Sequence, residues 1–186
     1  VLSLRVLGMD VLDFNRPTQL LSLMLDAALW GKHPFGFHLT SVLLHVAVTV
    51  LLFWFCRRLA TMGSAFAVAM LFAVHPVNCE AVAEVGYRED LLATVFVLAG
   101  LNCAAKWGAT WRGGISCALC LFLAIGAKES AVAGPVLLAL YWWWFRRHEP
   151  RHPWLWLIAA AALLVGGLVL ARFALAPEHS AIFSEK

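Results

Sequence analysis

The chain has 186 residues, of which 62% are hydrophobic and only 13% are charged, and its mean hydropathy is +0.82. An ordinary soluble domain is roughly 45–50% apolar and about 25% charged, and so short a domain leaves much of its surface exposed. The composition therefore excludes a water-soluble globular domain and indicates a membrane protein. The net charge of +3 comes without a basic stripe, so we expect no nucleic-acid partner.

The opening stretch, residues 1–35, is poorer in apolar residues than the rest of the chain. It carries scattered charges, among them Asp13, Arg16 and Asp26, and a run of leucines between residues 20 and 29. This mixture is typical of a helix that lies in the membrane interface, and Asp26 is expected on its polar face. The chain begins at Val1 without the basic segment or cleavage pattern of a signal peptide, so we expect a fragment that lacks an N-terminal portion.

Six hydrophobic segments come after residue 35, and most of them end at basic or polar residues. A membrane-spanning helix needs about 20 apolar residues, so the second and fourth segments are short for a span. The segments cover approximately residues 37–56, 64–77, 91–107, 114–127, 130–145 and 154–173. The sequence thus predicts an all-α, polytopic transmembrane helical bundle over 36–175. An outer loop with the interfacial helix precedes it over 1–35, and a polar tail occupies 176–186.

If all six segments cross the membrane, the polar loops fall into two groups. One side receives Arg57-Arg58, Lys106 with Arg112, and the basic residues between 146 and 151. The other side receives ten of the eleven acidic residues. Because basic residues beside helix ends favour the cytoplasm, we place the first side there and the acidic side outside.

Three charged motifs share the predicted non-cytoplasmic side. They are Arg16-Pro17-Thr18, the stretch from His75 to Asp90, and Lys128-Glu129. Ionisable residues at membrane depth are costly and usually mark a pathway or a site. Arginine offers a fork of donors to phosphate oxygens, and a carboxylate can act as general base toward a hydroxyl. The clustering predicts a wet cavity for a substrate with a lipid tail and a phosphate head.

Simpler interpretations exist for each motif alone. Glu84 and Arg88 are four residues apart and could form an ordinary helical ion pair. Lys128-Glu129 could be a solvated turn, and His75 before Pro76 could mark a helix end. A structural subunit without a site would leave the charged side chains pointing apart into water. A transporter or flippase-like protein would use the same cluster to bind an anionic lipid-linked substrate.

The charged motifs and the residues around them resemble a known membrane family. The resemblance covers roughly residues 13–145 in three runs. The first run comprises Arg16-Pro17-Thr18, Leu25-Asp26, Leu29–Thr40 and Leu43-Leu44-His45. The second comprises His75-Pro76-Val77, Glu80-Ala81-Val82, Val85, Arg88 and Asp90-Leu91-Leu92, and the third is Lys128–Val132. They resemble the membrane domain of the transmembrane and tetratricopeptide-repeat O-mannosyltransferases and their bacterial relatives, within the GT-C glycosyltransferase superfamily. The tail beyond residue 175 is too short for one 34-residue repeat.

The resemblance implies a glycosyltransferase. It would move a sugar, mannose by expectation, from a polyprenyl- or dolichyl-phosphate carrier to a Ser or Thr hydroxyl of a protein. The expected setting is a bacterial inner membrane or the endoplasmic reticulum membrane, with the active face non-cytoplasmic. The expected partners are the lipid-linked donor, a protein acceptor and the bilayer.

The resemblance also implies site residues. Arg16, Arg88 and Lys128 would contact the phosphate or the sugar-lipid, and acidic partners would orient them or the substrate. The substrate-binding set is Arg16, His75, Glu80, Arg88, Asp90, Lys128 and Glu129. The family's acidic pair in the first outer loop is missing, so the catalytic base is unassigned and Asp13 is only a candidate. No cluster has the spacing of a metal site, so no metal-ligating residue is predicted and the need for a divalent metal stays open.

Overall fold

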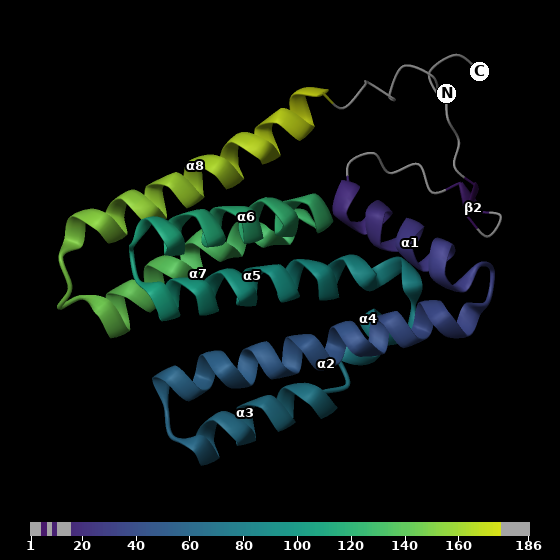
Figure 1. Cartoon of the computed structure of the whole chain (residues 1–186), viewed down its shortest axis with the longest axis horizontal. Helices are drawn as coiled ribbons and strands as arrows, with labels where there is room; N and C mark the ends of the chain where they lie inside the picture. Colours follow the sequence, from purple (N-terminus) through teal and green to yellow (C-terminus); the bar gives the residue numbers. More distant parts are fainter. Residues whose placement is uncertain (1–4, 7–8, 11–15, 176–186) are drawn as a thin grey trace.

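The computed structural model describes residues 5–6, 9–10 and 16–175, and this part of the chain is almost entirely helical (Figure 1). The exception is one short antiparallel pairing between β1 (Arg5–Val6) and β2 (Met9–Asp10). The helical architecture confirms the predicted all-α bundle. The predicted tail over 176–186 and Asp13 lie outside the described residues, and the predicted division of the chain at residue 35 stays a prediction.

The first three helices follow one another with short connections. Helix α1 (Pro17–Trp30) and helix α2 (Pro34–Leu59) each begin with a proline, whose fixed φ and missing N–H suit the first helical position. Helix α3 (Met62–Val74) is capped by Thr61, whose Oγ1 accepts a hydrogen bond from the Ser64 N–H at 3.3 Å. Helix α3 ends at Val74, directly before the His75-Pro76 pair, so this pair does mark a helix end.

A short irregular stretch leads into the central pair of helices. Helix α4 (Asn78–Ala83) and the 3₁₀ turn η1 (Val85–Tyr87) precede α5 (Arg88–Trp107), and α6 (Trp111–Ala127) runs back beside α5. Helix α5 ends at Gly108, whose φ of +62° is a conformation that glycine adopts without steric cost.

The fifth predicted segment is less regular than expected. It consists of the 3₁₀ turn η2 (Glu129–Val132), helix α7 (Ala133–Tyr141) and a π-helical turn η3 (Trp142–Arg146). The last helix, α8 (Arg151–Leu175), crosses back over α6 (Figure 1). The other predicted segments agree with single helices to within a few residues at each end.

The chain is an integral membrane protein. Three described helical stretches are long and apolar enough to span a bilayer: Pro34–Leu59, Val85–Trp107 and Arg151–Ala171. Helices α3 and α6 are apolar but shorter. Only 11% of the apolar window in α2 is buried inside the protein, so most of its hydrophobic surface requires lipid as its solvent.

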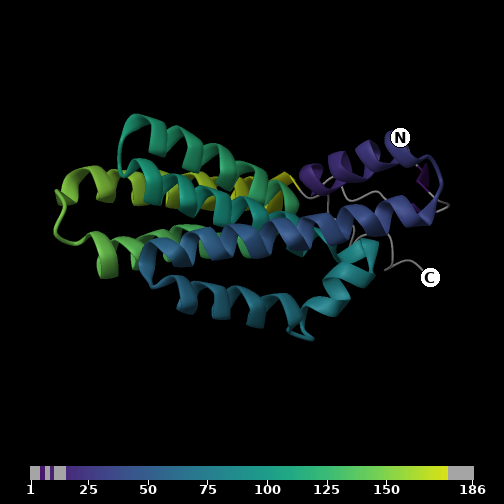
Figure 2. The same ribbon diagram turned by 60° about the horizontal axis from the view of Figure 1, so that its bottom comes forward.

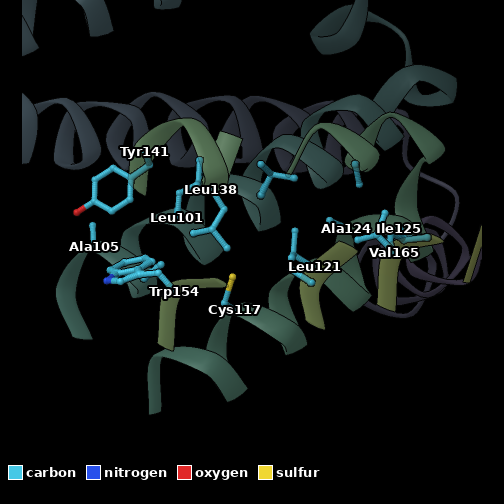
Figure 3. Close-up of a cluster of buried hydrophobic side chains, with 14 residues drawn as sticks. Leu101, Ala105, Cys117, Leu121, Ala124, Ile125, Leu138, Tyr141, Trp154 and Val165 are labelled. Carbon is cyan, nitrogen blue, oxygen red and sulfur yellow. The ribbon is translucent and has the colours of Figure 1, made fainter. Parts of the chain in front are cut away.

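The hydrophobic core lies between α5, α6, α7 and α8 (Figure 3). Trp154 on α8 and Leu138 on α7 are both buried to 1% exposure, and they meet Leu121 on α6 in one cluster. Gly134 allows α7 to come close to α6, since a Cβ there would lie 2.4 Å from Leu121 Cδ2. By contrast, α3 packs on α2 and lies outside this core (Figure 2).

The helices place the charged motifs at one end of the bundle and the basic loops at the other. The start of α5 and the end of α6 lie at one end, where α1 also packs (Figure 1). The end of α5, the end of α7 and the start of α8 lie at the other, where Arg146 reaches the Ala105 carbonyl. Helix α5 thus separates Arg88 from Lys106 by 18 residues, or about 27 Å at 1.5 Å per residue.

Candidate functional site

Five charged side chains meet at the first end of the bundle, and we call them the charged cluster. Each stands at an element boundary, where a side chain can reach beyond the apolar part of its helix. Arg16 immediately precedes α1, Glu89 and Asp90 lie in the first turn of α5, and Lys128 and Glu129 follow α6. Residues more than 100 positions apart in the sequence are therefore brought together.

Glu89 is the centre of the charged cluster. One carboxylate oxygen accepts a hydrogen bond from Arg16, and the other lies 3.3 Å from the Lys128 Nζ. Lys128 also donates a hydrogen bond of 2.7 Å to Asp90 Oδ2. A longer contact of 3.6 Å joins Arg16 to Glu129. Two cations are thus held beside three carboxylates.

The charged cluster combines one buried side chain with others that solvent can reach. The Glu89 side chain is only 6% exposed, whereas Arg16 and Lys128 are 27% and 25% exposed and Asp90 is 41% exposed. Burial alone would lower the pKa of Lys128, but its hydrogen bonds and charge interactions with Asp90 and Glu89 outweigh this and raise the pKa. Lys128 therefore carries a positive charge at every physiological pH.

A second polar network is centred on Arg88, the residue that precedes Glu89. The Arg88 guanidinium forms a 2.5 Å salt bridge with Asp26, donates a 2.7 Å hydrogen bond to the Phe37 carbonyl, and reaches the hydroxyls of Ser41 and Ser22 at 3.3 and 3.4 Å. The Arg88 side chain is 0% exposed. The network ties α1, α2 and α5 together from inside the protein.

Two interpretations of single residues are corrected by this network. Asp26 was expected on the polar face of an interfacial helix, but it is buried and accepts hydrogen bonds from Arg88 and from Thr40, the latter at 2.8 Å. The interpretation of Glu84 and Arg88 as an ion pair on one helix is wrong as well, because α4 ends at Ala83 and Arg88 belongs to α5.

Helix α1 is anchored close to the charged cluster. Thr18 Oγ1 donates a 2.9 Å hydrogen bond to the Leu123 carbonyl of α6, and Gln19 donates one of 3.0 Å to the Gly86 carbonyl. The close approach depends on Gly126, where a Cβ would lie 2.2 Å from Thr18 Oγ1. These contacts hold Arg16 at the end of α6 and therefore near Lys128.

The structure does not join His75 and Glu80 to the charged cluster. His75 is exposed, and its Nδ1 accepts a hydrogen bond of 3.2 Å from the Val77 N–H. It lines a separate cavity of about 440 Å³ together with His45 and Asn78. Glu80 is exposed in the first turn of α4 and forms no ion pair with another described residue. Among residues 16–175, the predicted residues that come together directly are Arg16, Asp90, Lys128 and Glu129.

Glu89 was missed by the sequence-based site assignment, although its motif was recognised. A signal for it exists in the helical pattern. Glu89 begins a stripe of buried residues spaced three or four apart along α5, which continues through Ala93, Val97, Gly100 and Ala104. A carboxylate at the head of an inward-facing stripe is expected to find a partner inside the protein.

The arrangement of Lys128 and Asp90 also argues against a structural subunit without a site. That interpretation predicts charged side chains pointing apart into water, whereas Lys128 Nζ and Asp90 Oδ2 lie 2.7 Å apart. In the described part of the chain, no group of three or more His, Cys, Asp and Glu side chains is placed to hold a metal ion.

Comparison with known proteins finds similarity to several named protein O-mannosyl-transferases. The chain is 46% identical over 90 residues to the protein O-mannosyl-transferase TMTC1 of Mus musculus, and the aligned segment covers 47% of this chain and 10% of that protein. It is 35% identical over 134 residues to TMTC2 of Mus musculus, covering 68% of this chain and 16% of that protein. It is 37% identical over 136 residues to Tmtc1 of Drosophila melanogaster, and the aligned segment covers 67% of this chain and 15% of that protein.

No protein-family model and no solved structure matches the chain. The chain spans only about a tenth to a sixth of the length of the curated relatives that it matches. Within that segment the identity of 35–46% confirms the resemblance inferred from the charged motifs. Over about half to two thirds of its own length, the chain is homologous to the TMTC protein O-mannosyl-transferases.

Proposed function

We propose that this chain forms part of a membrane-embedded protein O-mannosyltransferase. The enzyme would transfer mannose from a polyprenyl- or dolichyl-phosphate carrier to a Ser or Thr hydroxyl of a protein, on the non-cytoplasmic side of a bacterial inner membrane or of the endoplasmic reticulum. The observation that supports this most strongly is the charged cluster itself. It combines partly exposed cations with carboxylates at one end of an apolar bundle, in a homologue of named O-mannosyl-transferases.

The proposed reaction needs two kinds of protein group, a cation and a base. The acceptor oxygen forms a bond to the anomeric carbon of the sugar, and the bond from that carbon to the carrier phosphate breaks. The phosphate leaves with the electron pair, and the hydroxyl proton passes to a base. Positive charge near the leaving oxygen stabilises the developing phosphate charge, and a carboxylate within hydrogen-bond reach takes the proton.

Within the charged cluster, Arg16 and Lys128 are proposed to contact the carrier phosphate. Both cations keep about a quarter of their side chains exposed, and Lys128 is fully charged at neutral pH. Glu89 would hold the two cations at a fixed separation, because it contacts both of them from a buried position. Asp90 and Glu129, which are 41% and 40% exposed, would orient the sugar hydroxyls or the cations.

The remaining predicted residues take other proposed roles. Arg88 would act as a positioning residue, since its buried network fixes α1 and α2 against the start of α5. His75 and Glu80 would contact parts of the substrate further from the phosphate. The catalytic base is unassigned, with Asp13 as a candidate. The transfer assay, run with and without a divalent metal ion, tests whether the reaction requires the metal.

A transfer assay tests this proposal. The protein in liposomes is supplied with dolichyl-phosphate mannose and a Ser/Thr-containing peptide, with and without Mg²⁺ or Mn²⁺, and the mannosylated peptide is detected by mass spectrometry. The proposal predicts mannose transfer that falls sharply in the Arg16→Gln variant and is retained in Arg58→Gln, an exposed cation on α2 outside the charged cluster. Transfer that is equal in wild type and Arg16→Gln, or movement of the lipid across the bilayer without transfer, would overturn it.

A further inference from the structure

The end of the bundle opposite the charged cluster contains two adjoining cavities of different character. One has a volume of about 340 Å³ and a polar lining that includes Lys106, Thr110, Arg146 and Glu149. The other, of about 350 Å³, is an apolar groove between α6 and α8. Both volumes lie in the range of small-molecule sites. Ala109, Thr110 and Pro153 line both cavities, so the polar cavity adjoins the apolar groove.

Arg146 gives the polar cavity a fixed wall. Its guanidinium donates hydrogen bonds to the Tyr141 hydroxyl at 2.9 Å and to the Ala105 carbonyl at 3.0 Å, and it pairs with Glu149. Glu149 also accepts a 2.7 Å hydrogen bond from the buried Trp154 indole. Tyr141, Ala105 and Trp154 lie together at one end of the hydrophobic core (Figure 3). The charges of Arg146 and Glu149 therefore offset each other within a rigid frame.

Lys106 leaves this cavity with a net positive charge. It is exposed in the last turn of α5, and it forms no salt bridge with any residue in the described part of the chain. Its Nζ lies 5.1 Å from the centre of the ring of Trp107, which also lines the cavity. A cation in this position is available to an anionic group that enters the cavity.

The apolar groove is built to accept a chain-like group. Its lining includes small residues, Gly114 and Ala118 on α6 with Ala160 and Ala161 on α8, which leave space between the two helices. Trp111 and Trp156 border it, and they are 72% and 75% exposed. Tryptophan favours the membrane–water interface, so these rings place the junction between the two cavities at headgroup depth.

We infer that these two cavities together bind an anionic phospholipid. Its phosphate-bearing headgroup lies in the polar cavity beside Lys106, and one acyl chain lies in the groove between α6 and α8. A zwitterionic lipid would bring a second cation toward Lys106 and is disfavoured. The site lies about 27 Å along α5 from the charged cluster, so it is separate from the proposed site of sugar transfer.

Native mass spectrometry of the full chain, released from micelles that contain phosphatidylglycerol and phosphatidylcholine with identical acyl chains, tests the inference. Phosphatidylglycerol is expected to remain bound in preference. Lys106→Gln should reduce its retention about fivefold, as expected for one cation near a lipid headgroup. Arg58→Gln is the matched control, since it removes an exposed cation from the same end of the bundle but not from the cavity, and it should retain the lipid.

A second variant tests the groove. Ala160→Phe fills the space between α6 and α8 from an exposed position, so the fold is expected to survive, and it should also lose the bound lipid. Glycerol phosphate, which has the headgroup chemistry but no acyl chain, should not compete. Equal retention of the two lipids by wild type, unchanged retention in Lys106→Gln, or displacement by glycerol phosphate would overturn the proposal.

Discussion

Arg88 and Asp26, 62 residues apart in the sequence, form a salt bridge of 2.5 Å whose two side chains are 0% and 4% exposed. The pair joins the first turn of α5 to the C-terminal half of α1. A buried charge without a partner is costly, so each of these residues depends on the other. The salt bridge therefore fixes α1 to the bundle and positions Arg16, at the start of α1, within reach of Glu89.

The first prediction concerns this salt bridge. Asp26→Ala leaves the Arg88 guanidinium buried without its carboxylate, which typically costs about 3–5 kcal/mol. The variant should unfold at a clearly lower temperature in detergent than wild type. Asp26→Asn keeps an acceptor for Arg88 and for Thr40, so it should be destabilised less. Equal unfolding temperatures for wild type and Asp26→Ala would contradict the importance of the pair.

The second prediction concerns Glu89. Glu89→Gln removes the negative charge that links Arg16 to Lys128, so the two cations repel each other and lose their fixed separation. Mannosyl transfer should fall by about tenfold or more, in line with the loss of a charge-assisted hydrogen bond. Glu84→Gln is the control, because Glu84 is exposed and lies outside the charged cluster. If both variants are as active as wild type, Glu89 has no role in positioning the cations.

The third prediction uses two glycines with opposite surroundings. A Cβ at Gly126 would lie 2.2 Å from Thr18 Oγ1, so Gly126→Ala should push α1 away from α6 and lower both stability and transfer activity. A Cβ at Gly63, on α3, would meet nothing within 4 Å, and alanine is the better helix former there by roughly 0.5–1 kcal/mol. In thermal unfolding, the unfolding temperature should fall below that of wild type for Gly126→Ala and rise above it for Gly63→Ala. A stabilising effect of Gly126→Ala would rule out the close packing of α1 on α6.

Much of the helical bundle could be predicted from the sequence, because long apolar runs that end in charges have few other solutions in a bilayer. The breakdown of residues 129–146 into a 3₁₀ turn, an α-helix and a π-helical turn could not. The hydrophobic pattern is compatible with one regular helix, and the irregularities depend on tertiary contacts such as that of Arg146 with the Ala105 carbonyl.

The composition of the charged cluster was only partly predictable. Arg16, Asp90, Lys128 and Glu129 stand at the ends of apolar segments, so the predicted topology placed them on one side, and the structure places them at one end of the bundle. Asp26 could not be assigned in this way, because α1 resembles an interfacial helix in its composition and only tertiary contact with Arg88 reveals the buried pair. Topology also placed Glu80 on the same side, but it could not show that α4 keeps Glu80 out of the cluster.

The fourth prediction concerns acid conditions at the opposite end of the bundle. Burial by itself raises the pKa of Glu149, but hydrogen bonds from Trp154 and Arg146 and the Arg146 charge outweigh it, so the pKa is lowered below 4.5. The stabilisation from Glu149 is therefore present above pH 4.5 and is lost as the pH falls through the lowered value. Unfolding temperatures of wild type and Glu149→Gln should differ at neutral pH and converge as the pH falls below 4.5. A difference that stays constant over this range would contradict the lowered pKa.

The central claim is that the charged cluster binds the phosphate of a lipid-linked sugar, and Lys128 tests it most directly. The measurement is the initial rate of mannosyl transfer against donor concentration for wild type, Lys128→Gln, Lys128→Arg and the control Arg58→Gln. We expect Lys128→Gln to lower kcat/KM for the donor by roughly ten- to a hundredfold, Lys128→Arg to recover part of the loss, and Arg58→Gln to match wild type. Equal kcat/KM values in wild type and Lys128→Gln would contradict the claim.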